Sequence, residues 1–387
     1  MDGVTITLLF LIFAIVMFVW ERIPLSVTAM IVAVGLVVTG VLSPKDAFAG
    51  FVDTNVLLFM AMFIVGAAFF ETGVARDVGG IVTKFAGTER KLIISVMLIT
   101  GLMSGFLSNT GTAAVLIPVA IGLAQRAGFN RAKFLLPLVL ASAMGGNLSL
   151  IGAPGNMIAQ SGLSKIGLSF GFFDYALIGL PVLIVGIIYF VLIGYKLLPD
   201  EPARQPEEIY EETDYSKVPK YKKWIAGIVL IATIVGMIFE QQIGIKLYVT
   251  AWIGALVLIV TGTISETAAV KSIDMKTILL FVGSLALADA LVKTGTGTVV
   301  ADAIITALGS HPSPFVLMAV VFIIAAVLTN FMSNTATTAL LVPIGISLAQ
   351  QVGADPKAVL MATVIGGAEG GFNGQTAASS GNDKYHS

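Results

Sequence analysis

Residues 103–112 read MSGFLSNTGT, and residues 328–337 read LTNFMSNTAT. Each stretch interrupts a long apolar segment with Ser, Asn and Thr, the residue types that cap helix N-termini. Three further pairs of segments match in the same order, at an offset of 222 to 225 residues: Val27-Thr28-Ala29 with Val249-Thr250-Ala251, Val38-Thr39-Gly40 with Val260-Thr261-Gly262, and Leu57-Leu58-Phe59 with Leu279-Leu280-Phe281. Ordered matches at one offset predict two related halves.

The composition is that of a membrane protein. Of the 387 residues, 57% are hydrophobic and only 12% are charged. Apolar runs long enough to cross about 30 Å of hydrocarbon recur along the whole chain. The absence of cysteine excludes disulfide scaffolds and thiolate metal sites, and the two histidines are too few for a histidine metal cluster. A net charge of −1 leaves no basic footprint for nucleic acid.

The apolar runs divide each half into comparable spans. We expect a first repeat over 1–198, a polar linker over 199–223, a second repeat over 224–368 and a polar tail over 369–387. The spans expected in the first repeat are 4–20, 25–42, 54–72, 134–150 and 170–195, with a broken segment over 92–125. Those in the second repeat are 224–239, 247–264, 276–293 and 357–368, with a broken segment over 315–350.

The distribution of Lys and Arg indicates the topology. If both broken segments are re-entrant hairpins and the N-terminus lies outside, 16 of the 22 Lys and Arg residues fall on one side and five on the other, with Lys384 in the tail left out. An odd number of crossings per repeat then inverts the second copy. The sequence predicts an all-α polytopic membrane protein with two inverted-topology repeats, each with a re-entrant helical hairpin and a broken helix. It would lie in the plasma (cytoplasmic) membrane with a cytoplasmic linker.

The broken segments are the places to look for a binding site. A helix starting at each Ser-Asn-Thr would direct its free N–H groups and positive dipole end at the hairpin tip, where they favour an anion. Released carbonyl oxygens and the hydroxyls of Ser104, Thr329, Ser108 and Ser333 suit a hard cation such as sodium. Because neither tip contains Lys or Arg, a bound cation would also compensate the anion. The alternative is that Ser-Asn-Thr only caps and packs helices.

A second polar cluster follows the first hairpin at 145–156, reading GGNLSLIGAPGN. Glycines and a proline cannot continue a straight helix, so this span is predicted to break and to line the first cation site. Asp289 is the only carboxylate well inside a predicted span, where it could be a proton relay or could pair with Lys293. Glu71 is expected at the interface and His311 in a loop.

These motifs resemble those of the divalent anion:sodium symporter family within the wider ion transporter superfamily. The resemblance rests on the two Ser-Asn-Thr hairpins and on Gly152-Ala153-Pro154-Gly155-Asn156. It implies substrate contacts at Ser108, Asn109, Thr110, Ser333, Asn334, Thr335 and Pro154. It also implies a first sodium site at Ser104, Ser108, Asn109 and Gly152, and a second at Thr329 and Asn334. The family is typically dimeric, with a transport domain that moves like an elevator.

One departure from the family pattern follows Gly366-Gly367. The family would continue with a second Thr-Pro-containing loop and a final span, whereas residues 368–387 are short and hydrophilic. We therefore expect a C-terminally truncated or frame-shifted member.

The predicted function is sodium-coupled symport of a small divalent anion, with a dicarboxylate as the favoured substrate. The predicted partners are that anion, the lipid bilayer and a second copy of the chain, and sodium ions are the expected cofactor. The alternatives are a sodium/proton antiporter or an arsenite- or sulfate-type permease of the same superfamily, and, from another class, a non-transporting receptor or assembly protein. The chain is not expected to be an enzyme, because it has no histidine placed to activate a serine and no intramembrane Asp pair.

Overall fold

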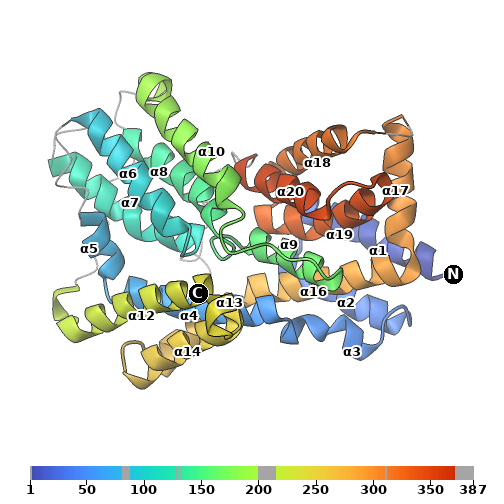
Figure 1. Cartoon of the computed structure of the whole chain (residues 1–387), viewed down its shortest axis with the longest axis horizontal. Helices are drawn as coiled ribbons and strands as arrows, with labels where there is room; N and C mark the ends of the chain where they lie inside the picture. Colours follow the sequence, from blue (N-terminus) through green and yellow to red (C-terminus); the bar gives the residue numbers. More distant parts are fainter. Residues whose placement is uncertain are drawn as a thin grey trace. The chain divides into compact units, whose positions relative to one another are not determined.

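The computed structural model describes residues 2–80, 88–126, 130, 132–198, 215–309 and 312–370. Within these ranges the regular structure is helical, with no strand (Figure 1). Six helices in the described part of the chain are long and apolar enough to cross a membrane: Gly3–Trp20, Thr54–Glu71, Ala176–Leu197, Lys220–Ile238, Met275–Thr294 and Asn334–Val352. The chain is therefore an all-α polytopic membrane protein, as its composition predicts.

The order of helices repeats along the chain. The first series is α1 Gly3–Trp20, α2 Leu25–Val38, α3 Pro44–Ala47, α4 Thr54–Glu71, α5 Val74–Gly80, α6 Glu89–Ser104, α7 Asn109–Arg126 and α8 Ala132–Gly145. The second is α12 Lys220–Ile238, α14 Leu247–Val260, α15 Glu266–Ser272, α16 Met275–Thr294, α17 Thr296–Ala307, α18 Pro314–Leu328, α19 Asn334–Val352 and α20 Pro356–Glu369. Each helix of the first series has a counterpart in the second.

Several elements lie outside this repeated order. They are α9 Pro154–Lys165, α10 Ala176–Tyr189, the π-helical segment Phe190–Gly194, α11 Tyr195–Leu197 and α13 Glu240–Ile243. The predicted span 170–195 corresponds to α10 and the π-helical segment after it. α12 begins at Lys220, inside the last residues of the predicted linker 199–223. Linker residues 199–214, His311 and tail residues 371–387 lie outside the described ranges.

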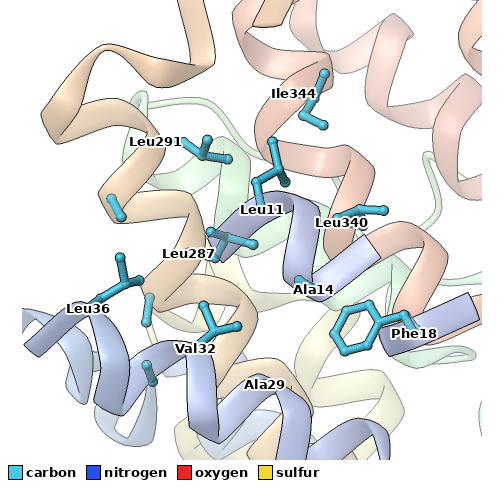
Figure 2. Close-up of a cluster of buried hydrophobic side chains, with 14 of the residues drawn as sticks. Leu11, Ala14, Phe18, Ala29, Val32, Leu36, Leu287, Leu291, Leu340 and Ile344 are labelled. Atoms are coloured by element: carbon cyan, nitrogen blue, oxygen red, sulfur yellow. The ribbon is translucent and has the colours of Figure 1, made fainter. Parts of the chain in front are cut away.

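The chain separates into two compact units, each assembled from distant segments. Unit 1 comprises residues 1–60, 154–171 and 274–373, and unit 2 comprises residues 61–153, 172–273 and 374–387. The core of unit 1 is an apolar cluster between α1, α2, α16 and α19 (Figure 2). Side chains from all four helices meet there, including Leu11, Leu36, Leu287 and Leu340, each at most 4% exposed. Burial of this cluster holds α19 in place.

A glycine allows α2 and α16 to approach each other closely in unit 1. A Cβ atom on Gly283 would lie 2.4 Å from the carbonyl oxygen of Ala29, closer than Cβ atoms approach other atoms in proteins. Small residues at such crossings let two backbones approach, which is how helices pack tightly when lipid removes the hydrophobic drive between them.

The corresponding helices of the two repeats make similar close contacts. In unit 2, a Cβ on Gly145 of α8 would lie 2.2 Å from the carbonyl oxygen of Gly101 on α6. In unit 1, a Cβ on Gly370, directly after α20, would lie 2.4 Å from Cα of Ala326 on α18. Each position in the second contact is 225 residues beyond its counterpart in the first. The repeat therefore extends from the sequence to helix packing.

Replacement of Gly283 by Ala tests the contact between α2 and α16. The added methyl group would force the helices apart, and overpacking of this kind costs about 1–3 kcal/mol. We expect a lower thermal unfolding midpoint for the purified protein, although Gly→Ala in a helix otherwise stabilises by up to about 1 kcal/mol. Gly80→Ala is the control, because a Cβ there meets no atom within 4 Å. Equal midpoints for Gly283→Ala and the wild type would contradict the contact.

Candidate functional site

Both Ser-Asn-Thr motifs lie where one helix ends and the next begins. α6 ends at Ser104 and α7 begins at Asn109, and the equivalent break separates α18 from α19. The Ser108 hydroxyl accepts a hydrogen bond from the Gly111 amide at 3.1 Å, and Ser333 accepts one from the Ala336 amide at 3.2 Å. The serine of each motif therefore acts as a helix N-cap, as its residue type predicts. The breaks fall within the predicted hairpins 92–125 and 315–350.

A second hydrogen bond also recurs at both tips. The Ser104 hydroxyl donates to Oδ1 of Asn109 at 2.7 Å, and the Thr329 hydroxyl donates to Oδ1 of Asn334 at 2.5 Å. Ser104 is fully buried and Thr329 is 1% exposed. The bond joins the last turn of the incoming helix to the first residue of the outgoing helix. It fixes the asparagine oxygen inside the break, where it can serve as a ligand.

Additional polar contacts surround the first tip in unit 2. The Ser142 hydroxyl on α8 donates to the Asn109 carbonyl at 2.7 Å, and the Ser104 hydroxyl donates to the Ser142 carbonyl at 2.6 Å. The Ser149 hydroxyl donates to the Gly105 carbonyl, one of those released where α6 ends. Sequence reasoning missed Ser142, because a small polar residue in an apolar helix carries no specific signal, whereas Ser149 lies in the stretch 145–156 that is predicted to line the first cation site.

The segment after α8 is broken, as its glycines and proline predict. A short 3₁₀ turn covers Gly146–Leu148, Ser149 is extended, and α9 starts at Pro154. A Cβ on Gly152 would lie 2.5 Å from the Gly146 carbonyl oxygen and 3.0 Å from that of Gly105. Gly152 thus packs against backbone carbonyl groups beside the first tip.

The second tip, in unit 1, has a different set of neighbours. The Thr338 hydroxyl donates to the Asn334 carbonyl at 3.0 Å, and the Asn334 side-chain amide donates to the Ala368 carbonyl on α20 at 3.5 Å. The start of α9 packs here, since a Cβ on Gly155 would lie 2.9 Å from the Thr338 hydroxyl oxygen. The structure therefore brings Pro154, the first residue of α9, toward the second hairpin.

The remaining predicted substrate residues are accessible to different degrees. Thr110 is exposed, whereas Ser108, Asn109, Ser333, Asn334 and Thr335 are half-buried. The first amides of α7 and α19 have no partner within their own helices, because a helix leaves its first N–H groups free. Each tip therefore offers N–H donors and a positive dipole end beside neutral hydroxyl, amide and carbonyl oxygens. Hard cations such as sodium prefer ligands of that oxygen type.

Comparison with known proteins places the chain in a family. Residues 15–366 match the family model CitMHS, described as "Citrate transporter". The chain belongs to the citrate transporter family. The members of this family are named as transporters, not as enzymes. The narrower resemblance to divalent anion:sodium symporters remains a prediction.

Relatives in this family are also named as transporters. "Uncharacterized transporter YfbS" of Escherichia coli is 33% identical over 211 residues, which are 54% of this chain and 35% of that protein. An "Uncharacterized transporter" of Haemophilus influenzae is 29% identical over 360 residues, covering 88% of this chain and 76% of the relative. The chain thus matches about a third of the E. coli protein and about three quarters of the H. influenzae protein.

The fold is similar to that of a solved transporter. The crystal structure of the Alcanivorax borkumensis YdaH transporter, described as having an unusual topology, gives a TM-score of 0.61 at 16% identity. The match covers 83% of this chain and 75% of that one. At this identity the similarity supports the fold alone.

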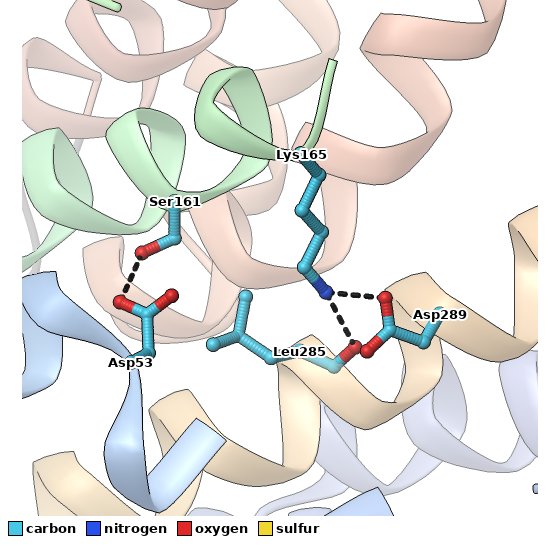
Figure 3. Close-up of polar contacts among 5 residues, drawn as sticks. All are labelled: Asp53, Ser161, Lys165, Leu285 and Asp289. Carbon is cyan, nitrogen blue, oxygen red and sulfur yellow. Dashed lines mark hydrogen bonds and ion pairs between the residues drawn. The ribbon is translucent and has the colours of Figure 1, made fainter. Parts of the chain in front are cut away.

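The citrate transporter family member described here also carries an ion pair that sequence reasoning did not predict. Lys165, the last residue of α9, forms an ion pair with Asp289 of α16 and donates to the Leu285 carbonyl at 3.4 Å (Figure 3). The prediction that Asp289 pairs with Lys293 is therefore wrong. Lys293 instead lies 3.8 Å from the Asp46 carboxylate. The spacing along one helix could not reveal a partner on α9, which is 124 residues away.

The partner of Lys293 lies in the short helix α3. The hydrogen bond from Ser43 lowers the pKa of the Asp46 carboxyl, and the charge of Lys293 lowers it further. Both side chains are about half exposed, so solvent screens this pair and it contributes little to stability.

The same face of α9 makes a second polar contact, one turn before Lys165. The Ser161 hydroxyl donates to the Asp53 carboxylate at 2.9 Å (Figure 3). The Asn55 side-chain amide donates to Ser161 at 3.0 Å. Asp53 also caps α4, accepting from the Asn55 amide at 2.8 Å. α9 is therefore held at two successive turns, to the start of α4 and to α16.

A double-mutant cycle measures the coupling between Lys165 and Asp289. Asp289→Asn leaves the ammonium group without its carboxylate, and because the pair is about one third exposed we expect a loss of up to about 1 kcal/mol of stability. Lys165→Met combined with Asp289→Asn should recover part of that loss, giving a non-additive cycle in thermal unfolding. Strict additivity would contradict a direct pair.

The same variants test the antiporter alternative. A proton-carrying Asp289 would make transport fail in Asp289→Asn even where Lys165→Met restores stability. Retained transport in the stable double variant would exclude that role.

Proposed function

We propose that this transporter is a sodium-coupled symporter of a small carboxylate anion with at least two negative charges. The observation that carries the proposal is the pair of matching tips, each with a capped helix start and a hydroxyl-to-asparagine hydrogen bond. Transporters of inverted-repeat design bind ligands at discontinuous helices of this kind.

The anion class follows from the helix starts and from the family. The N-termini of α7 and α19 offer free amides and a positive dipole end, and both are ready-made anion sites. The start of α9 lies beside the second turn of α19, which adds another helix N-terminus to the second tip. The family description names citrate, so a di- or tricarboxylate fits both lines of support.

Cation coupling follows from the charges at the tips. Neither 103–112 nor 328–337 contains Lys or Arg, so fixed side chains supply no positive charge to a carboxylate bound there. An unpaired anion at membrane depth is costly. Sodium, when bound, would supply that charge. Ser104, Asn109 and the carbonyls beside Gly152 would hold it at the first tip, and Thr329 and Asn334 at the second.

The residues of the tips would have separate tasks in this mechanism. Asn109 and Asn334 each belong to both parts of a tip: the side-chain oxygen accepts from the hydroxyl of the incoming helix, and the residue begins the outgoing helix. A single asparagine can therefore contact both the sodium ion and the anion, which would couple their binding free energies. Thr110 and Thr335, next along each motif, would contact the anion. The plasma membrane, an outside N-terminus and a homodimeric assembly complete the proposal.

Replacing the tip asparagines tests the proposal. In proteoliposomes, labelled citrate and succinate uptake should depend on an inward sodium gradient in the wild type. Asn109→Ala and Asn334→Ala should each lower that uptake about tenfold or more, because a hydrogen bond to a charged group contributes about 1.5–3 kcal/mol.

Asn330→Ala is the matched control at the second tip. Its side chain is exposed and donates to the Ala326 carbonyl at 2.6 Å. We expect uptake close to wild type for this variant. Uptake that needs no sodium gradient and survives both Asn109→Ala and Asn334→Ala would reject sodium-coupled symport at the tips.

A further inference from the structure

Two buried threonines lie one turn into the helices that start at the tips. Thr112 of α7 and Thr337 of α19 are both fully buried. Neither hydroxyl has a hydrogen-bond partner within the described part of the chain. A buried hydroxyl left unpaired costs about 1–3 kcal/mol. Each of these hydroxyls therefore needs a partner that the described residues do not supply.

The lack of a partner is unusual for a threonine in these helices. A helical threonine can donate to the carbonyl four residues earlier. Thr72, Thr294 and Thr363 do so at 2.7–2.9 Å. The amides of Thr112 and Thr337 each bond to the carbonyl four residues earlier, at 2.9 Å, but their hydroxyls do not. Their own helices therefore do not satisfy the two hydroxyls.

The two threonines occupy equivalent positions in the repeat. They are 225 residues apart, the offset that separates the Ser-Asn-Thr motifs. Two other buried threonine hydroxyls lack a partner among the described residues, at Thr28 and Thr100, and neither is shared by both repeats. The counterpart of Thr28 is Thr250, which donates to the Lys246 carbonyl, and the counterpart of Thr100 is an alanine. Recurrence distinguishes the tip threonines.

Thr100 lines a cavity of about 10 Å³ between α5, α6, α7 and α8. The surface of this cavity is apolar, so it offers no polar partner to a water molecule. Neither tip threonine lines this cavity.

Helix geometry places both threonine side chains over the first turns of α7 and α19. Helical side chains lean toward the N-terminus, and residues four apart share a face. Thr112 therefore lies over the first turn of α7 on the side of its cap Ser108, and Thr337 lies likewise over the first turn of α19. The methyl group of Thr337 is 3.8 Å from the position of a Cβ on Gly367, so α20 packs against it.

We infer that Thr112 and Thr337 are further oxygen ligands of the two proposed sodium sites. The inference rests on the proposed sodium coupling. It groups Ser104, Asn109 and Thr112 at one tip, and Thr329, Asn334 and Thr337 at the other. Sodium binding would give each hydroxyl a partner.

Valine substitution separates a ligand from a packing residue, because valine keeps the shape and removes the hydroxyl. Thermal unfolding of the purified full chain would be followed while sodium chloride replaces choline chloride at constant ionic strength. In sodium-free buffer, Thr112→Val and Thr337→Val should unfold at or above the wild-type temperature. Their apparent sodium dissociation constants should rise about tenfold, equivalent to about 1.4 kcal/mol.

Two further variants act as controls. Thr363→Val removes a buried hydroxyl that already has a partner, so it should lower the sodium-free midpoint and leave sodium affinity unchanged. Thr112→Ser and Thr337→Ser keep the hydroxyl and should keep sodium affinity within a few-fold of wild type. The serine variants also provide a folded comparison if a valine variant cannot be purified.

The outcomes distinguish this inference from the proposed function. A wild-type sodium shift that is unchanged in Thr112→Val and Thr337→Val overturns the inference and leaves sodium coupling intact. A loss of sodium affinity in the serine variants as large as in the valine variants overturns it too, since packing would then explain both. No sodium shift in the wild type, together with sodium-independent uptake, overturns sodium coupling and this inference with it.

Discussion

A helix that ends inside an apolar segment leaves carbonyl and N–H groups without partners, and lipid cannot satisfy them. Both tips in this chain meet that constraint in the same way. A serine caps the outgoing helix, and a hydroxyl from the incoming helix bonds the asparagine between them. These contacts satisfy some of the polar groups that each break leaves without a partner. The break in turn places amides, carbonyls and hydroxyls together.

Tight helix packing surrounds these breaks. Gly145 of α8 lies against α6, and Gly370, directly after α20, lies against α18 at the equivalent position of the repeat. Close backbone approach brings Ser142 within reach of the first tip and Ala368 within reach of the second. A ligand site made of neutral groups needs this precision, because hydrogen bonds and ion–dipole contacts weaken steeply with distance and angle.

The sequence predicts the repeat, the helical class and the two breaks, because each depends on local pattern. The Ser-Asn-Thr motifs and the glycine-rich stretch 145–156 carry their structure in residue type and spacing. The contacts of Ser142, Ser149 and Lys165 could not be predicted, because they join helices far apart in the chain. Asp289 shows the difference: its spacing along the helix suggested Lys293 as the ion-pair partner, whereas tertiary packing brings Lys165 to it.

Equal motifs do not make the two tips equivalent. At the first tip, the single hydroxyl proton of Ser104 is shared between Oδ1 of Asn109 and the carbonyl oxygen of Ser142. The Ser142 hydroxyl oxygen lies 3.3 Å from the Ser104 hydroxyl oxygen. At the second tip, the Thr329 hydroxyl bonds Asn334 and is carried by a β-branched side chain. β-Branching restricts χ1, so Thr329 has fewer rotamers open to it than Ser104. The first tip therefore takes its neighbouring polar contacts from α8, whereas the second takes one from α20.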